Sequence, residues 1–224
     1  EGSSAITKGG FVTYSNDAAG VEIPEHTYVD GFCEVCGNID PEYLQPNEEG
    51  FYEISTDMQL AWFSQKIAKA DDRSLNVKLM NDIDMEDAAN ERFIAIGTES
   101  SPYTGTFDGD FHTIDYLYVN QPSTRGVGLI GAVAGPAVIE NLTLGANCRL
   151  IGMGYVGLIG FSTPAGGTVT FTNLGNLGYV ECTTGANAGG LVGCCMSSAC
   201  TFIITNCYSM ATIVGTKENG AFSG

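Results

Sequence analysis

The sequence predicts an all-β protein whose second half is a parallel β-helix with coils of about 30 residues. Three observations support this fold class: a glycine tag recurs, a second tag recurs in phase with it, and no stretch within a repeat has the pattern of an amphipathic helix. The glycine tag begins at residues 128, 157, 190 and 220, in steps of 29, 33 and 30 residues. Its copies are Gly128–Gly131, Gly157–Gly160, Gly190–Gly193 and Gly220–Gly224. The second tag occurs at Ile139–Leu142, Phe171–Leu174 and Ile204–Cys207.

Stacking of successive coils about 4.8 Å apart explains why the tags recur, because equivalent residues then form ladders. Three inward ladders are expected: Leu129, Leu158, Leu191 and Phe222; Ile139, Phe171 and Ile204; and Leu142, Leu174 and Cys207. A fourth row is expected to stack at a corner, where side-chain amides can bond along the stack. It consists of Asn141, Asn173 and Asn206.

Four segments are expected along the chain. An extended segment covers residues 1–24, a small His/CxxC module covers 25–50, a helical cap covers 51–72, and the β-helix repeats cover 73–224. The cap is predicted because Ser55–Asp57 can begin a helix, and apolar residues follow at helical spacing as far as Ala70. Trp62 and Phe63 are expected to plug the first coil, since a solenoid needs a capped end.

The charge balance excludes one class of partner. The chain has a net charge of −17, with 9 Lys and Arg against 26 Asp and Glu. Nucleic acid is not expected to bind, because that requires clustered cations. No run of 18 apolar residues occurs, so direct membrane insertion is not expected either.

The tags resemble the GLUG-motif repeats of bacterial cell-surface proteins, in which a Gly-Leu-(Val/Ile/Phe)-Gly tag precedes an Ile-x-Asn-(Leu/Cys) tag. Gly50–Phe63 is similar to the helix-cap lead-in of those proteins, and Thr106–Ile114 to their first strand, with Asp110-Phe111 where Asn-Gly is usual. The resemblance implies a right-handed parallel β-helix on a secreted or surface-anchored protein, adhesin-like or an accessory region of an IgA-protease-like enzyme. It transfers no catalytic residues.

An extracellular or cell-surface location is therefore expected. The first residues, Glu1–Ala5, do not have the pattern of a signal peptide, so a signal is either absent or already removed. Gly220–Gly224 has the pattern of another repeat opening, and more coils are expected C-terminal to Gly224.

A metal-ligand pattern occurs near the N-terminus. Cys33 and Cys36 have the two-residue spacer that lets both thiolates face one metal, Gly37 permits the turn, and His26 lies seven residues upstream of Cys33. Asp30 or a partner chain could supply a fourth ligand to a structural zinc ion. A disulfide or free thiols are the alternatives. The other six cysteines are interpreted as small buried apolar residues, or as allowing one disulfide among Cys194, Cys195 and Cys200.

The predicted function is a non-enzymatic binding or spacer module that contacts host glycans or proteins. Exposed tyrosines could stack on sugars or pack on a protein, the alternative being ordinary half-buried strand positions; they are Tyr103, Tyr116, Tyr118 and Tyr155. A polysaccharide-active enzyme, or an accessory domain of a secreted protease, is the second hypothesis. Asp108 and Asp110 are also candidate ligand-binding residues, and with His112 they could share one face. The alternative is that Asp108-Gly109 forms a turn that His112 caps. The later acids Glu140, Glu181 and Glu218 lie in different parts of their repeats, so they are not expected to align as a catalytic pair.

Overall fold

The computed structural model describes residues 6–8, 11–13, 26–69, 72–162, 167–184, 187–195, 200–215 and 219–220. The chain forms two compact units, Glu1–Tyr43 and Leu44–Gly224. In the first unit, β1 (Ile6–Lys8) pairs antiparallel with β2 (Phe11–Thr13), and β3 (Tyr28–Val29) pairs antiparallel with β4 (Phe32–Cys33). Asp30 and Gly31 join β3 to β4 with φ of 49° and 81°, as a tight two-residue hairpin requires.

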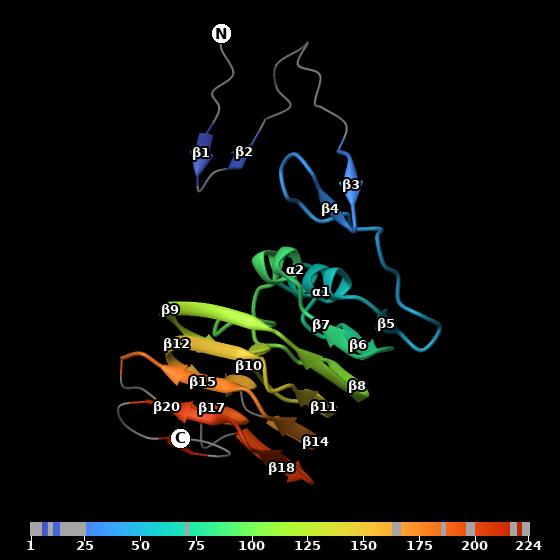
Figure 1. The fold of residues 1–224 in the computed structure, drawn as a ribbon. Coiled ribbons are helices and arrows are strands. Elements are labelled where there is room, and N and C mark those ends of the chain that lie inside the picture. The colour runs from blue at the N-terminus through green and yellow to red at the C-terminus, as the bar shows by residue number, and fades with distance from the viewer. Residues whose placement is uncertain are drawn as a thin grey trace, which may run out of the picture. The chain divides into compact units, whose positions relative to one another are not determined.

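The second unit is a parallel β-helix, which confirms the predicted fold class (Figure 1). One sheet has the order β18 (Cys200–Thr205), β14 (Gly167–Asn176), β11 (Val138–Leu144), β8 (Thr106–Asp115), β6 (Asn76–Leu79) and β5 (Phe51–Ile54). Beside it, β19 (Tyr208–Ser209) pairs with β14, and β7 (Ile83–Asp84) pairs with β8.

Two further parallel sheets complete the coils. One has the order β20 (Thr212–Val214), β15 (Tyr179–Cys182), β12 (Arg149–Val156), β16 (Ala188–Gly189) and β21 (Asn219–Gly220), with β9 (Tyr118–Val127) also beside β12. The other consists of β10 (Ile130–Val133), β13 (Ile159–Ser162) and β17 (Val192–Cys195).

The predicted helical cap is present as α1 (Asp57–Lys69), at the same end of the stack as α2 (Asp87–Arg92) and β5 (Figure 1). A capping box begins α1: the Gln59 N–H donates to Thr56 Oγ1, and Gln59 Oε1 accepts from the Thr56 N–H. The helix buries Trp62 and Phe63 completely. The first coil therefore does not expose its apolar interior at this end.

The predicted inward ladders are present in the described coils. Leu129, Leu158 and Leu191 are buried, whereas Phe222 lies outside the described residues. Ile139, Phe171 and Ile204 are in register across β11, β14 and β18. Ile204 is nevertheless 45% exposed, because it lies on the last described coil of this sheet. Leu142 pairs with Leu174, whose N–H donates to Cys207 Sγ.

The predicted asparagine stack forms at a corner of the coils. Asn173 Nδ2 donates to Asn141 Oδ1 at 2.7 Å, and Asn141 Nδ2 donates to Asp108 Oδ1 at 3.0 Å. Asn141, Asn173 and Asn206 all have φ near 54°. Asparagine adopts this left-handed conformation more readily than other residues with a Cβ, so the tag needs Asn for its backbone as well as its side chain.

The coil of β8 and β9 departs from the repeat at two places. Glu140 pairs with Asp108 but Leu142 pairs with His112, so Gly109–Phe111 stand opposite the single residue Asn141. Gly152 pairs with Gln121 but Gly154 pairs with Arg125, so Pro122–Thr124 stand opposite Met153. We call these insertions the β8 bulge (Gly109–Phe111) and the β9 bulge (Pro122–Thr124).

Candidate functional site

Two of the predicted binding tyrosines line a cavity of about 660 Å³ between α2, β9 and β12. Tyr116 is 52% exposed and Tyr118 is 46% exposed. We call this hollow the tyrosine cavity; its polar lining includes Asp87, Asn90, Glu91, Asn120, Gln121, Asn147 and Arg149. Exposed aromatic rings beside amides and carboxylates can stack on a sugar ring and hydrogen-bond to its hydroxyl groups.

Asn90 of α2 holds the two tyrosines in place. Its Oδ1 accepts a hydrogen bond from the Tyr118 N–H at 2.9 Å, and its Nδ2 donates to the Tyr116 carbonyl at 2.9 Å. Asn120 Nδ2 donates to the Tyr118 hydroxyl at 2.8 Å. Tyr116 has a φ of 55°, a conformation that costs energy for a bulky residue and persists only where the surroundings impose it. The backbone of both tyrosines and the ring of Tyr118 are therefore held in place before any ligand arrives.

An aromatic and cationic row extends from this cavity across β12 to β15. Tyr118 pairs with Arg149, and Arg149 pairs with Tyr179. The Arg149 guanidinium carbon lies 4.5 Å from the centroid of the Tyr179 ring, a cation–π contact. The Tyr179 hydroxyl donates to Glu181 Oε2, which raises the pKa of Tyr179. The row adds planar, hydrogen-bonding surface beside the cavity.

The other two tyrosines take different positions. Tyr103 is fully buried, and its hydroxyl donates to the carbonyls of Leu75 and Thr106. Its assignment as an exposed binding residue is therefore wrong, because the ring is covered completely and its hydroxyl bonds to carbonyls of the coils. Tyr155 is half-buried, its ring 5.8 Å from that of Phe161 and 5.5 Å from the Arg125 guanidinium carbon.

Asp108 and Asp110 lie together on the outer face, where both are engaged by the protein. Lys78 Nζ lies 3.2 Å from Asp110 Oδ2 and 4.0 Å from Asp108 Oδ2. Asp108 Oδ1 also accepts from the Asp110 N–H and from Asn141. His112 does not join them, because its Nδ1 lies 3.1 Å from Asp82 Oδ1.

One carboxylate near Asp108 was missed by sequence reasoning. Glu140 pairs directly with Asp108 across β11 and β8. Partial burial, and then the Asp108 charge, raise the pKa of Glu140. Glu140, Glu181 and Glu218 do not align with one another in the repeats, whereas the partner of Glu140 lies in the preceding coil. The register of the coils, once known, is the signal that finds this pair.

The predicted metal ligands His26, Cys33 and Cys36 converge in the first unit. Their ligand atoms all lie within 4.8 Å of one another. His26 Nδ1 lies 3.2 Å from Cys33 Sγ and 3.5 Å from Cys36 Sγ. Around a tetrahedral zinc ion with ordinary bond lengths, nitrogen and sulfur ligands are about 3.6 Å apart. The three residues thus fit a zinc ion.

The electrostatics of this cluster favour a thiolate. Hydrogen bonds from the Cys36 backbone and the His26 side chain lower the pKa of Cys33 to about 6. Gly37 has a φ of 69°, which permits the turn after the second cysteine. Asp30 occupies the hairpin turn and is not among the three converging residues, so its role as a fourth ligand stays a prediction.

Comparisons with known proteins give a fold but no function. No protein-family model matches the sequence. The chain is 38% identical over 107 residues to halomucin of Haloquadratum walsbyi, a match that covers 47% of this chain and 1% of halomucin. It also resembles the crystal structure of a candidate immunoglobulin A1 protease from Bacteroides ovatus, with a TM-score of 0.50 and 17% identity.

The extent of these matches limits what they show. The structural likeness covers 80% of this chain and 68% of the Bacteroides protein, and at 17% identity it supports the fold alone. The chain spans a very small part of halomucin. Within the described residues, the helices are too short and too polar to cross a bilayer. The resemblance to GLUG-motif repeats rests on the tags themselves.

Proposed function

We propose that this chain is a non-enzymatic binding module of a secreted or cell-surface protein, and that it binds a glycan in the tyrosine cavity. The observation that carries this proposal is the exposure of two aromatic rings, Tyr116 and Tyr118, in one cavity among side-chain amides. Aromatic faces contribute a large contact area at a low cost in conformational entropy. The amides supply both donors and acceptors for sugar hydroxyl groups.

The comparisons support the surface setting of this proposal. The chain is similar to part of a protein named halomucin and to the fold of a protein described as a candidate immunoglobulin A1 protease. The halomucin match agrees with an extracellular setting, and the structural likeness supports the fold alone. The adhesin-like, GLUG-type character is part of the proposal. A protein ligand, a spacer role and a polysaccharide-active enzyme are the other outcomes that an experiment must distinguish.

The test is a panel of host and plant polysaccharides and mucin, scored for binding and for release of reducing ends. We expect binding without release. The double variant Tyr116→Ala/Tyr118→Ala should lose it, whereas Tyr208→Ala should keep it, since Tyr208 is equally exposed but does not line the cavity. Released reducing ends that disappear in Glu140→Gln would instead establish an enzyme. Failure of every glycan to bind would contradict the proposal and favour a spacer or a protein ligand.

We also propose that His26, Cys33 and Cys36 hold a structural zinc ion. The converging ligand atoms and the lowered pKa of Cys33 support it. Elemental analysis of the chain, purified without a chelator, should find zinc in equimolar amount, and the Cys33→Ser/Cys36→Ser variant should lose it. A chain without zinc whose Cys33 and Cys36 resist alkylation until reduced would show the disulfide alternative instead.

A further inference from the structure

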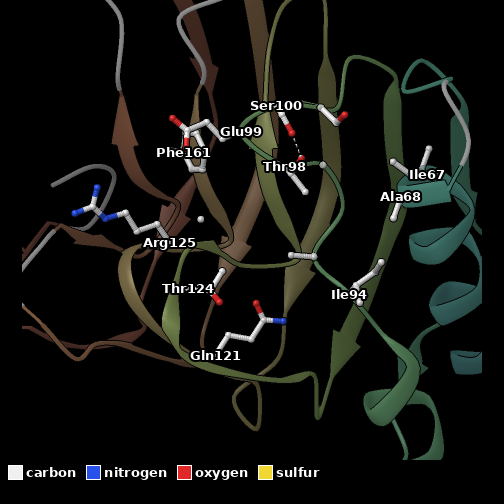
Figure 2. A pocket seen from close by; sticks show the side chains of 14 residues that line it. Ile67, Ala68, Ile94, Thr98, Glu99, Ser100, Gln121, Thr124, Arg125 and Phe161 are labelled. Carbon is white, nitrogen blue, oxygen red and sulfur yellow. Dashed lines mark hydrogen bonds between the residues drawn. The ribbon is translucent and has the colours of Figure 1, made fainter. Parts of the chain in front are cut away.

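A second cavity lies further along β9 than the tyrosine cavity, towards the C-terminal end of the strand. It has a volume of about 720 Å³ and is formed by the end of α1, the segment 94–101, β9 and Phe161. We call it the cap cavity. In the view of Figure 2, Gln121 and Thr124 of β9 lie at one end, Thr98 and Ser100 at the opposite end, and Ile67 and Ile94 to one side.

The two cavities meet at one residue. Gln121 lines both of them, with Tyr118, Val119 and Asn120 on the tyrosine side and Thr124, Arg125 and Gly126 on the cap side. The part of β9 from Tyr118 to Arg125 lies opposite Arg149 to Gly154 of β12. Its length along the sheet is therefore roughly 17 Å. The two cavities thus follow one another along β9 over a length that exceeds one sugar ring.

The β9 bulge lies at the junction. Pro122–Thr124 are the inserted residues, and the Pro122 carbonyl accepts a hydrogen bond from Thr183 Oγ1 at 3.2 Å. Thr183 follows β15, two coils further on, so the contact ties the bulge across the intervening coil of β12. A bulge redirects the side chains that follow it, and here it places Thr124 in the lining of the cap cavity.

The lining of the cap cavity suits an uncharged ligand. Hydroxyl groups come from Thr98, Ser100, Ser101 and Thr124, and an amide comes from Gln121. The segment 98–101 is held by two backbone hydrogen bonds between Thr98 and Ser101, at 2.9 and 3.0 Å. The charged residues of the lining are Glu99 and Arg125, which balance each other. With a net charge of −17, the chain as a whole repels polyanions.

We propose that the two cavities form one extended site for a linear, neutral oligosaccharide, which crosses from Tyr118 over Gln121 to Thr124. This inference rests on the proposed glycan binding and adds to it the length and charge class of the ligand. Rings stack on the tyrosines in one cavity. In the other, sugar hydroxyl groups bond to Gln121 and Thr124, and the apolar ring face lies against Ile67 and Ile94.

Titration calorimetry with β-1,4-linked oligomers of glucose, mannose and N-acetylglucosamine tests the proposal, from dimer to hexamer. At least one series should bind, with affinity rising about tenfold or more with length. Thr124→Trp fills the cap cavity from an exposed position and should abolish this gain with length. Thr205→Trp, an equally exposed threonine outside both cavities, is the control and should keep the gain.

Two results would overturn the inference. One is a gain with length that survives Thr124→Trp, and the other is the absence of any gain in all three series. If glycans of the panel bind but no neutral oligomer does, the extended site is wrong and the glycan-binding function stands. If no glycan binds at all, the function itself is wrong. Circular dichroism of each variant checks that the fold is retained.

Discussion

The coil of β8 and β9 differs from the coils that follow it. In the later coils, β11 and β14 stay in register from Val138 to Leu144, with apolar ladders inside and the asparagine stack at the corner. The coil of β8 and β9 carries both bulges, pairs its acids with Lys78, and lines both cavities through β9. The regular repeat thus builds the scaffold, and the departures from it position the groups that can bind a ligand.

The largest expected difference between the two regions is the loss of unfolding free energy when a phenylalanine is replaced by alanine. Phe171 is buried in a ladder of the regular coils, so Phe171→Ala should lower the free energy of unfolding by about 3–5 kcal/mol. Phe111 is 74% exposed in the β8 bulge, so Phe111→Ala should change it by less than about 0.5 kcal/mol. Urea denaturation of both variants measures this; equal losses would contradict the distinction between scaffold and bulge.

The asparagine corner should show a smaller effect that separates backbone from side chain. Asn141→Ala removes the bonds to Asp108 and Asn173 and places a Cβ at a φ of 54°, which should cost about 1–3 kcal/mol. Asn141→Gly loses the same bonds but tolerates the backbone, so it should cost less. If glycine costs as much as alanine in denaturant unfolding, the left-handed conformation is not a source of strain here.

A glycine substitution in the β8 bulge should not lower stability, in contrast to the substitutions of Asn141. Phe111 has a φ of 65°, which is unfavourable for an aromatic residue, and its ring is mostly exposed. Phe111→Gly should therefore leave stability unchanged or raise it by up to about 1 kcal/mol. Thermal unfolding compared with Phe111→Ala gives the measurement, because alanine retains the strain. A loss of stability in the glycine variant would show that the ring has a packing role.

The smallest effects are expected in the pH dependence of stability. The Thr113 N–H and His112 lower the pKa of Asp82, so its contribution is present above the unfolded pKa and lost as pH falls through the folded one. Asp82→Asn should therefore lose less stability than the wild type on acidification below pH 4. The effect should stay below about 1 kcal/mol, since the pair with His112 is largely exposed.

Glu140 should behave with the opposite sign. Its pKa is raised by burial and by Asp108, so its contribution is present below the unfolded pKa and lost as pH rises through the folded one. At pH 7 the free energy of unfolding of Glu140→Gln should therefore be higher, relative to the wild type, than it is at pH 4. Urea midpoints at the two pH values check this, and a gain confined to pH 4 would contradict the raised pKa.

Sequence periodicity predicted the ladders because each tag places one residue type at one position of every coil. Leu129 and Leu158 are buried, and Asn141 and Asn173 are bonded, as the tags predicted. The period could not predict the environment of residues outside the tags. Tyr103 lies outside the tags, and a tyrosine there could be exposed or buried; the coils around it bury it completely.

By itself, the sequence determined the winding of the chain, the inward residues of each repeat, the capping helix and the spacing of His26, Cys33 and Cys36. These follow from local patterns, which recur or act over a few residues. Only the tertiary structure decided that Glu140 faces Asp108, that Tyr116 and Tyr118 share a cavity, and that Gln121 joins it to another. Such contacts depend on the register between coils, and a bulge that adds two residues to one strand shifts that register without leaving a periodic trace in the sequence.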